Sequence, residues 1–365
     1  MQPDEGIRRV LIHRLGSLGD TVVALPCFHL IARAFPNAER RLLTNFPVHA
    51  KAPASAAVLG DSGLVHGYLR YTVGTRNPVE LLRLAGEIRR FRPEVLVYLM
   101  PLRPWKAVRR DLLFFRFAGV GRVAGNVGEK EMQSRFDAST GLFERESDRL
   151  ARMVAGLGDA GTADAANWDF LLTDGERERA LVALGALAGR PLVVCGPGTK
   201  RWVNDWGVEK WQSLLGRIGA KYPGHGLALV GAKEDFDGAK RVAMHWTGPS
   251  LNLCGRLAPR ETAAAMEKAR IFLGPDSGPM HLAAAVGVPC AIPFSARGLP
   301  GIWFPRGSRH QILYHRPGCF GCGLERCNVA GQPCLTSISV EEMEAAVDRV
   351  MEGKEGRQEL VLLPS

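Results

Sequence analysis

The sequence predicts an α/β protein made of two domains, each with a parallel β-sheet covered by helices. Short apolar or β-branched runs alternate with amphipathic helical stretches in both halves of the chain. Glycine-containing turns follow strand-like runs at residues 14–20, 195–202 and 272–281. The length of 365 residues is too great for one ordinary core and suits two. Two such domains create a cleft at the carboxyl ends of their strands, where open α/β sheets bind ligands.

The first half of the chain is expected to supply one of the sheets. Its predicted strands cover residues 8–14, 40–44 and 94–100. Its predicted helices run from the first turn to about Ala34 and over residues 78–91 and 106–117. Pro26 lies inside or early in the first helix, so we expect a kink or a late start there.

The second half repeats the pattern. Its predicted strands cover residues 192–195, 227–231, 271–274 and 288–293, and its predicted helices cover residues 208–220, 260–269, 279–286 and 339–351. A charged helix over residues 175–187, followed by Gly189 and Pro191, marks the boundary between the domains. We therefore expect an N-terminal domain at 1–174, a C-terminal domain at 175–338, and a last helix with a disordered tail at 339–365.

The net charge of +10 is concentrated in residues 1–150, which carry +8. A nucleic acid, a phosphorylated glycolipid or an anionic membrane surface would each suit this excess, and so would a plain solvated surface. No nucleic-acid-binding module is recognisable, so no nucleic-acid partner is expected. The basic, aromatic helix at 106–117 allows two interpretations: a patch for the inner membrane, or a helix that buries Leu112 and Phe115 beneath solvated arginines.

The lack of a recognisable targeting signal and the pattern of cysteine usage indicate a cytoplasmic protein. No apolar run reaches the length of a membrane span, and the charged N-terminus does not resemble a signal peptide. Four scattered cysteines lie in apolar surroundings and are expected to be packed thiols rather than disulfides. These cysteines are Cys27, Cys195, Cys254 and Cys290.

The loop after the first strand is the first candidate site. Its two glycines let the backbone turn tightly and leave room for a ligand. Asp20 has two interpretations there: a cap of the following helix, or a general base that faces the cleft. Capping stabilises the carboxylate, which opposes its use as a base. The other residues assigned to this acceptor-side loop are Arg14, Gly16, Ser17 and Gly19.

Two loops of the second half are candidates for a donor site. One precedes a helix with proline in its first turn, so free N–H groups there suit a phosphate, and Asp276 suits ribose hydroxyls or capping. His281 either reaches the ligand or is packed. The other loop holds a hydroxyl and two cations, which suit a diphosphate or form an ordinary basic loop. The assigned residues are Asp276, Ser277, Gly278, Pro279, Met280 and His281 in the first loop, and Gly198, Thr199, Lys200 and Arg201 in the second.

Taken in this order, the segments resemble glycosyltransferase family 9, the ADP-heptose heptosyltransferases, over about residues 10–349. The resemblance is carried by RLGSLGDTVVALP at 14–26 and DSGPMHLAAAVGVP at 276–289, and NLCG at 252–255 also fits. It implies a GT-B architecture, in which two Rossmann-like domains face each other and the helix at 339–351 crosses back to the first.

The resemblance also implies an activity, which is an inverting, metal-independent sugar transfer that requires no cofactor. The N-terminal domain would hold the acceptor and the C-terminal domain the nucleotide-sugar donor. Asp20 would be the base that takes the proton of the acceptor hydroxyl, and the segment at Asp276 would hold the leaving diphosphate. The expected reaction moves a sugar, such as heptose from ADP-heptose, to lipopolysaccharide or another cell-surface glycan precursor. Such an anionic glycolipid or glycan acceptor implies peripheral contact with the inner membrane.

Four further cysteines form a compact set among glycines. Four thiolates could close a tetrahedral zinc or iron site, and some relatives of the family that modify autotransporter proteins carry a cysteine-bound metal near the C-terminus. Such a metal would be structural, because no His or carboxylate of the cluster suggests an open coordination position. Reduced thiols or an incidental redox pair would explain the set as well. These cysteines are Cys319, Cys322, Cys327 and Cys334.

One position departs from the family pattern. Asn204 stands where members often have a lysine that meets the donor phosphate, so Lys200 and Arg201 would have to supply the charge. The departure leaves open a second function, a catalytically silent protein that binds nucleotide sugars or glycans on the same fold. A third function, heptosyl transfer to protein, is suggested by the cysteine cluster.

Overall fold

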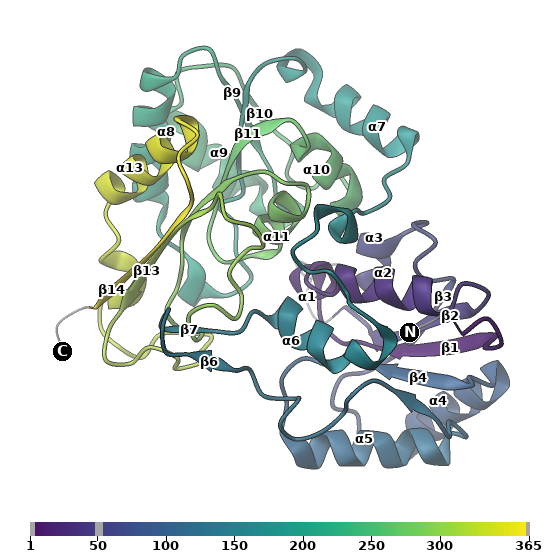
Figure 1. Cartoon of the computed structure of the whole chain (residues 1–365). Helices are drawn as coiled ribbons and strands as arrows, with labels where there is room; N and C mark the ends of the chain where they lie inside the picture. Colours follow the sequence, from purple (N-terminus) through teal and green to yellow (C-terminus); the bar gives the residue numbers. More distant parts are fainter. Residues whose placement is uncertain (1–3, 48–53, 363–365) are drawn as a thin grey trace. The chain divides into compact units, whose positions relative to one another are not determined.

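The chain folds into two α/β units in the computed structural model, which describes residues 4–47 and 54–362 (Figure 1). The first unit is Met1–Leu171 and the second is Leu172–Ser365. Each is built on one parallel sheet, so the fold class predicted from the sequence is confirmed. Among the described residues, no helix has the length and apolar character needed to cross a bilayer.

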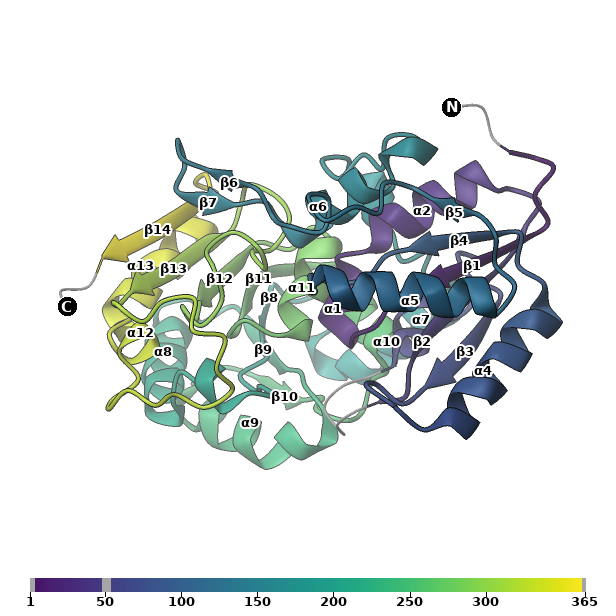
Figure 2. The same ribbon diagram turned by 90° about the horizontal axis from the view of Figure 1, so that it is seen from below.

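The sheet of the first unit has the strand order β3–β2–β1–β4–β5, and all of its pairs are parallel. Its strands are β1 (Arg9–His13), β2 (Glu39–Asn45), β3 (Gly67–Tyr71), β4 (Val95–Tyr98) and β5 (Val123–Ala124). Its helices are α1 (Leu18–Val22), α2 (Leu25–Ala34), α3 (Ser55–Leu59), α4 (Pro78–Phe91), α5 (Trp105–Phe117) and α6 (Glu146–Met153). Helix α2 lies on one face of the sheet, and α4 and α5 lie on the other (Figures 1 and 2).

The sheet of the second unit has the order β10–β9–β8–β11–β12–β13–β14, again parallel throughout. Its strands are β8 (Leu192–Cys195), β9 (Gly226–Leu229), β10 (Ser250–Asn252), β11 (Ala269–Leu273), β12 (Cys290–Pro293), β13 (Gln311–Arg316) and β14 (Arg357–Leu362). Its helices are α7 (Asp174–Leu184), α8 (Val208–Lys221), α9 (Phe236–Val242), α10 (Pro259–Met266), α11 (Gly278–Ala285), α12 (Pro333–Thr336) and α13 (Val340–Met351). A small hairpin, β6 (Phe136–Asp137) and β7 (Leu142–Phe143), belongs to the first unit.

Both sheets contain a point at which the direction of strand order reverses. In the first unit it lies between β1 and β4, and in the second between β8 and β11. The central strands β4 and β8 are buried along their whole length, as expected for parallel strands covered on both faces. Ligands of open α/β sheets bind at the carboxyl ends of the strands beside such a reversal. The candidate loops follow β1, β8 and β11, so each begins at a reversal point.

The kink or late helix start expected at Pro26 takes the form of a break between two helices. The residues from Leu18 to Ala34 form two helices, α1 and α2, rather than one. Pro26 lies in the first turn of α2, where its missing N–H has no helical partner to lose. The four scattered cysteines are also buried free thiols, as predicted, and burial raises the pKa of Cys27 to about 12.

The end of the chain differs from expectation. Helix α13 packs on α8 and on strands β11–β13 of the second unit. Its expected return to the first unit stays a prediction. Its buried face, formed by Met343, Ala346, Val347 and Val350, supports this packing. Arg217 of α8 adds exposed ion pairs to Glu341 and Glu344 at 2.7 and 3.0 Å. The tail expected to be disordered contains β14, which pairs in parallel with β13.

Candidate functional site

The loop between β1 and α1 holds Asp20 in a fixed position. The N–H of Ser17 donates to Asp20 Oδ2 at 2.9 Å, and the Ser17 hydroxyl donates to the same oxygen at 3.3 Å. Gly16 has a φ of +137°, and a Cβ on it would lie 2.2 Å from the Cβ of Asp20. The carboxylate therefore lies over a glycine that no larger residue could replace without movement. Within the described residues, Asp20 Oδ1 takes no hydrogen bond.

Capping and catalysis are compatible at Asp20. The N-cap of α1 is Ser17, and Asp20 accepts the N-cap N–H from the third helical position. Gly19 lies in the same first turn. The cap uses one carboxylate oxygen and leaves the other with its lone pairs, so the sequence alternatives of cap or base do not exclude each other in this geometry.

Arg14 fixes the backbone beneath Asp20. Its Nε and Nη2 donate to the Asp20 carbonyl oxygen at 3.1 and 2.8 Å, and its Nη1 donates to the carbonyl of Leu99 after β4. The charge of Arg14 is balanced by Glu146, 3.2 Å away, which also binds Arg149 at 2.7 Å. All three side chains are essentially inaccessible to solvent. We call this set the buried charge triad: Arg14, Glu146 and Arg149.

A second buried cluster lies where β1, β3 and β4 end. His13, Tyr71 and Tyr98 are the last residues of these strands. His13 Nε2 lies 3.1 Å from the Tyr71 hydroxyl, and Tyr98 donates to Asp111 of α5 at 2.9 Å. Burial lowers the pKa of His13 to about 4, so its ring is neutral at neutral pH. Sequence reasoning missed these residues, although their position at strand ends was a signal that could have identified them.

In the second unit, the loops after β8 and β11 contact each other. A Cβ on Gly274, just after β11, would lie 2.8 Å from the carbonyl oxygen of Gly196. A Cβ on Gly198 would lie 2.4 Å from the carboxylate of Asp235, so this glycine allows the loop to pass close to a charged side chain. Thr199 closes a turn, since its hydroxyl oxygen accepts the N–H of Arg201 at 3.2 Å. Lys200 is exposed at the tip of this loop.

Asn204 joins the two loops. Its Nδ2 donates to the carbonyl oxygen of Asp276 at 2.8 Å and lies 3.5 Å from a carboxylate oxygen of the same residue. Asn204 is only 2% exposed, and its Oδ1 has no hydrogen-bond partner among the described residues. The hydroxyl of Ser277 is also buried and without a partner there. Polar atoms left in this condition are costly unless a ligand or water binds them.

Helix α11 follows directly, with Ser277 as its N-cap and Gly278 and Pro279 as its first residues. Its free N–H groups therefore lie beside Asp276, as predicted. Met280 and His281 are buried, and the His281 ring packs edge-on against Trp303 at 6.2 Å. The packed interpretation of His281 is thus the one that the geometry favours.

The four clustered cysteines do not form a metal site in the described arrangement. Cys319, Cys322 and Cys327 lie on a loop between β13 and α12, and Cys334 is buried beside Ser295. Among the described residues, no three His, Cys, Asp or Glu side chains are placed so that they could hold a metal ion. The thiol chemistry suits zinc or iron, whereas the present spacing of the thiols does not.

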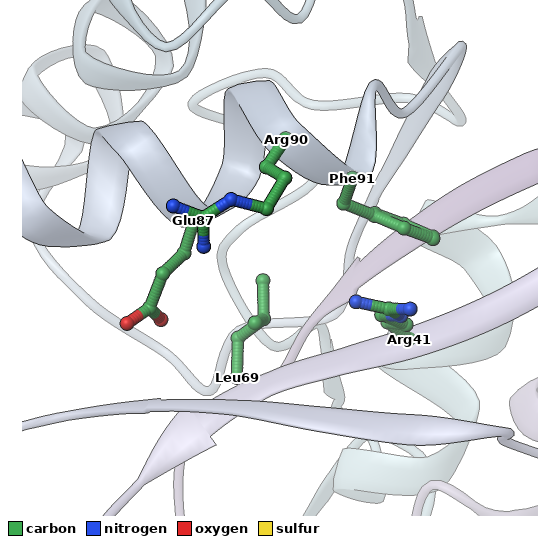
Figure 3. A pocket seen from close by; sticks show the side chains of 5 residues that line it. All are labelled: Arg41, Leu69, Glu87, Arg90 and Phe91. Atoms are coloured by element: carbon green, nitrogen blue, oxygen red, sulfur yellow. The ribbon is translucent and has the colours of Figure 1, made fainter.

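A separate hollow of about 430 Å³ lies in the first unit, between α4 and strands β2 and β3 (Figure 3). The guanidinium of Arg41 stacks on the ring of Phe91 at 4.4 Å on its wall. Leu69, Glu87 and Arg90 complete the lining. None of these residues belongs to a loop at the carboxyl end of a strand, and the sequence singled out none of them.

Comparison with known proteins supplies the family context. The model of glycosyltransferase family 9 (heptosyltransferase) matches residues 113–293, from α5 to β12. Lipopolysaccharide heptosyltransferase 3 of Escherichia coli is 29% identical over 111 residues, which are 30% of this chain and 32% of that protein. The match therefore spans about a third of this curated relative.

Solved structures share the fold over nearly the whole chain. The glycosyl transferase family 9 protein of Veillonella parvula has a TM-score of 0.72 at 16% identity, covering 95% of this chain and 98% of that one. E. coli ADP-heptose LPS heptosyltransferase II has a TM-score of 0.64 at 15% identity, covering 94% and 99%. The iron-containing dodecameric glycosyltransferase TibC of enterotoxigenic E. coli has a TM-score of 0.52 at 12% identity, covering 97% and 78%. At these identities the likeness establishes the fold, two Rossmann-like units of GT-B type.

Proposed function

Because this chain belongs to glycosyltransferase family 9, we propose that it transfers a sugar from a nucleotide donor to a hydroxyl of a cell-surface glycan precursor. The observation that carries the proposal is the Asp20 carboxylate, held by Ser17 through one oxygen while the other has no partner in the described chain. The names of the E. coli relatives support heptose as the sugar, ADP-heptose as the donor and lipopolysaccharide as the acceptor. The proposed reaction takes place in the cytoplasm, at the surface of the inner membrane.

In the proposed reaction, Asp20 takes the proton of the acceptor hydroxyl as that oxygen forms a bond to the anomeric carbon. The bond from the anomeric carbon to the donor phosphate breaks, and its electron pair leaves on the diphosphate. Attack opposite the leaving group inverts the anomeric centre. Arg14 is a positioning residue, because it holds the backbone of Asp20 and touches no reacting atom. No step uses a metal or cofactor.

The second unit would bind the donor through the loops after β8 and β11. Lys200 and Arg201 supply positive charge, and the N–H groups at the start of α11 suit phosphate oxygens. Asp276 beside them would accept hydrogen bonds from ribose hydroxyls. These contacts favour the developing charge of the leaving diphosphate, which is where stabilisation lowers the barrier.

The first experiment is a thermal-shift panel of ADP, GDP, UDP and CMP, followed by a transfer assay with the nucleotide sugar that matches. We expect ADP alone to raise the melting temperature, because a ligand that binds only the folded state stabilises it. Asp20→Asn should keep ADP binding and lose at least about 100-fold in turnover. Asp61→Asn, an exposed aspartate of the same unit, is the matched control. Normal turnover by Asp20→Asn would refute the catalytic assignment, and normal binding without turnover in the wild type would favour a silent binding protein.

A glycolipid acceptor would place the enzyme at a membrane surface, and one face of α5 suits that role. This face exposes Leu113 and Phe117, which are 64% and 55% accessible. The cations Lys106, Arg109 and Arg116 lie on the same face at helical spacing and are exposed. Basic and apolar groups on one helix face match the headgroup region of an anionic bilayer.

Sedimentation with vesicles tests this part of the proposal. We expect the protein to bind vesicles of anionic phospholipid and not those of phosphatidylcholine alone. The double variant Arg109→Glu/Arg116→Glu should lose most of this binding. Arg76→Glu/Arg256→Glu changes the net charge equally at exposed positions elsewhere and should retain it. Equal loss in both variants would mean that net charge alone, not the α5 face, drives the association.

The cysteines between β13 and α12 carry a separate structural proposal. The iron in the name of TibC and the thiol donor set support a zinc or iron ion held by these residues. Because the described arrangement brings no three of them together, the loop would have to close around the ion. Elemental analysis of the purified protein should find about one metal per chain, and Cys322→Ser/Cys327→Ser should lose it. A metal-free wild type would end this proposal without affecting the transfer reaction.

A further inference from the structure

The loop that carries the clustered cysteines is attached to the candidate donor site. The N–H of Gly323 donates to the carbonyl of Arg297 at 2.8 Å, and the N–H of Val203 donates to the carbonyl of Glu325 at 3.4 Å. Gln332 donates to the carbonyl of Val203 at 2.6 Å. The loop therefore bonds to the segment after β12 on one side and to the segment after β8 on the other.

Residues 323–325 of this loop hold two arginines. Arg297 donates from Nε to the carbonyl of Leu324 and from Nη2 to the carbonyl of Gly323, both at 2.7 Å. Arg201 lies 3.7 Å from a carboxylate oxygen of Glu325. Sequence reasoning named Arg201 and missed Arg297, which comes from a different strand end. We call Arg201 and Arg297 the arginine pair.

The positive charge of the arginine pair is poorly compensated. Arg297 makes no ion pair with the described residues, and its two carbonyl partners bring dipoles but no negative charge. Glu325 is 79% exposed, so water screens most of its attraction for Arg201. Burial and then the charge of Arg201 lower the pKa of Arg297, while Asp276 raises it, so all three charges act on one region. Two guanidinium groups in this condition favour an anion between or beside them.

The neighbouring polar atoms point to the same kind of ligand. Ser277 offers a buried hydroxyl and Asn204 a buried amide oxygen, and neither has a partner among the described residues. The hydroxyl can donate to a phosphate oxygen, whereas the amide oxygen needs a donor such as a sugar hydroxyl. A ligand that satisfies both carries phosphate and hydroxyl groups together, as a nucleotide sugar does.

We propose that the arginine pair binds the diphosphate of the donor in place of the family lysine, and that residues 323–325 position it. The inference deepens the proposed function, since it rests on a nucleotide-sugar donor in the second unit. It assigns to the cysteine-containing loop a role in binding that does not depend on a metal. The position of Asn204 then needs no cation, because Arg297, which follows β12, supplies the positive charge.

Binding measurements by calorimetry test the pair on the full-length protein. Arg297→Gln should weaken ADP binding about 10- to 100-fold, the loss expected for a charge-assisted hydrogen bond, and Arg297→Lys should recover part of it. Adenosine, which has no phosphate, should bind both proteins with equal affinity. Arg326→Gln, an exposed arginine of the same loop, is the matched control and should bind ADP like the wild type. Unchanged ADP affinity in Arg297→Gln would overturn the proposal while leaving the transfer reaction standing.

Labelling of wild-type protein with phenylglyoxal gives a test that no substitution can disturb. ADP and inorganic pyrophosphate should protect Arg201 and Arg297 from modification, adenosine should not, and Arg326 should react equally in every sample. Equal labelling of Arg297 with and without pyrophosphate would refute the proposal. If pyrophosphate protects the arginines but the protein binds none of the four nucleotides, the arginine pair binds anions and the assignment of a nucleotide-sugar donor is refuted.

Discussion

Arg14 and Arg297 each lie after a central strand of a parallel sheet, yet they are held in opposite ways. Arg14 is fully buried and paired with Glu146, and its other N–H groups bind the carbonyl of Asp20 and that of Leu99 after β4. Arg297 is half-buried and has carbonyl partners but no carboxylate in the described chain. The comparison teaches that position at a strand end does not make an arginine a ligand-binding residue. Under the proposed assignment of Arg297, incomplete compensation of its charge does.

Among the substitutions that test this comparison, Glu146→Ala is expected to have the largest effect on stability. The substitution leaves Arg14 and Arg149 buried without a counter-charge, which should lower the free energy of unfolding by about 3–5 kcal/mol. Urea unfolding followed by circular dichroism measures it. The matched Glu325→Ala, which removes the exposed partner of Arg201, should change stability by less than about 0.5 kcal/mol. Similar losses in the two variants would mean that the triad is no more structural than the arginine pair.

The next effect concerns pH and the buried cluster at the strand ends of the first unit. Burial lowers the pKa of His13 from 6.5 to about 4, and the charges that face the ring are those of Asp111 and Arg103. Between pH 6.5 and 4 the unfolded chain binds a proton that the folded chain does not. Stability from this group is therefore complete above pH 6.5 and falls by about 3 kcal/mol as the pH drops to 4.

Unfolding midpoints measured from pH 7 to pH 4 check this expectation. His13→Gln should show a shallower fall than the wild type over that range, because the glutamine does not titrate. His245→Gln, at an exposed position of the second unit, should keep the wild-type slope. Parallel pH profiles for His13→Gln and the wild type would contradict the assignment.

A smaller effect on stability distinguishes the steric need for Gly16 in the Asp20 loop from its need for a positive φ. Gly16 and Gly74 both have positive φ, but a Cβ would meet Asp20 only at Gly16 and open space at Gly74. Gly74→Ala should cost about 1 kcal/mol of stability, and Gly16→Ala about 2 kcal/mol with a fall in turnover. Thermal unfolding and the transfer assay measure the two. Equal costs with normal turnover would show that the loop tolerates displacement of the carboxylate.

The smallest effect is the stability of the Arg297→Gln variant. Since Arg297 makes no ion pair with the described residues, its removal should change the free energy of unfolding by less than about 1 kcal/mol. Arg14→Gln should cost several times more, because it breaks the buried charge triad. Chemical unfolding of both variants completes the comparison. A larger loss for Arg297→Gln than for Arg14→Gln would reverse the roles given to the two arginines.

Local patterns predicted the elements that position the site. The bounds expected for α4 and β8 agree with the structure, because an amphipathic helix that begins at a proline, and a short apolar run before a glycine turn, are local signals. Strand β14 was missed because its side chains are half-exposed or exposed and only its last three residues, 360–362, are apolar. The partner of helix α13 could not be predicted from local patterns, because α8 lies more than 120 residues away along the chain.

The candidate site likewise has a part that local sequence predicts and a part that it does not. The motif loops around Asp20 and Asp276 could be found from glycines, prolines and their place after strands. The residues that contact these loops could not be predicted from the sequence. Glu146, for example, pairs with Arg14 although 132 positions separate them in the chain. Arg297 reaches the cysteine-containing loop across 26 or 27 positions. Pairing over such separations is fixed by the order of strands in the sheet, which periodicity does not reveal.

The buried charge triad has a consequence for the order in which the first unit can be completed. All five strands of its sheet are contained in residues 9–124, but the carboxylate that neutralises Arg14 arrives only with α6. A chain emerging from the ribosome could assemble the sheet and would still carry an unbalanced cation beneath the Asp20 loop until residue 146 is made. A fragment of this unit cut after β5 should therefore keep its secondary structure and lose the geometry of the Asp20 loop, on which the proposed reaction depends.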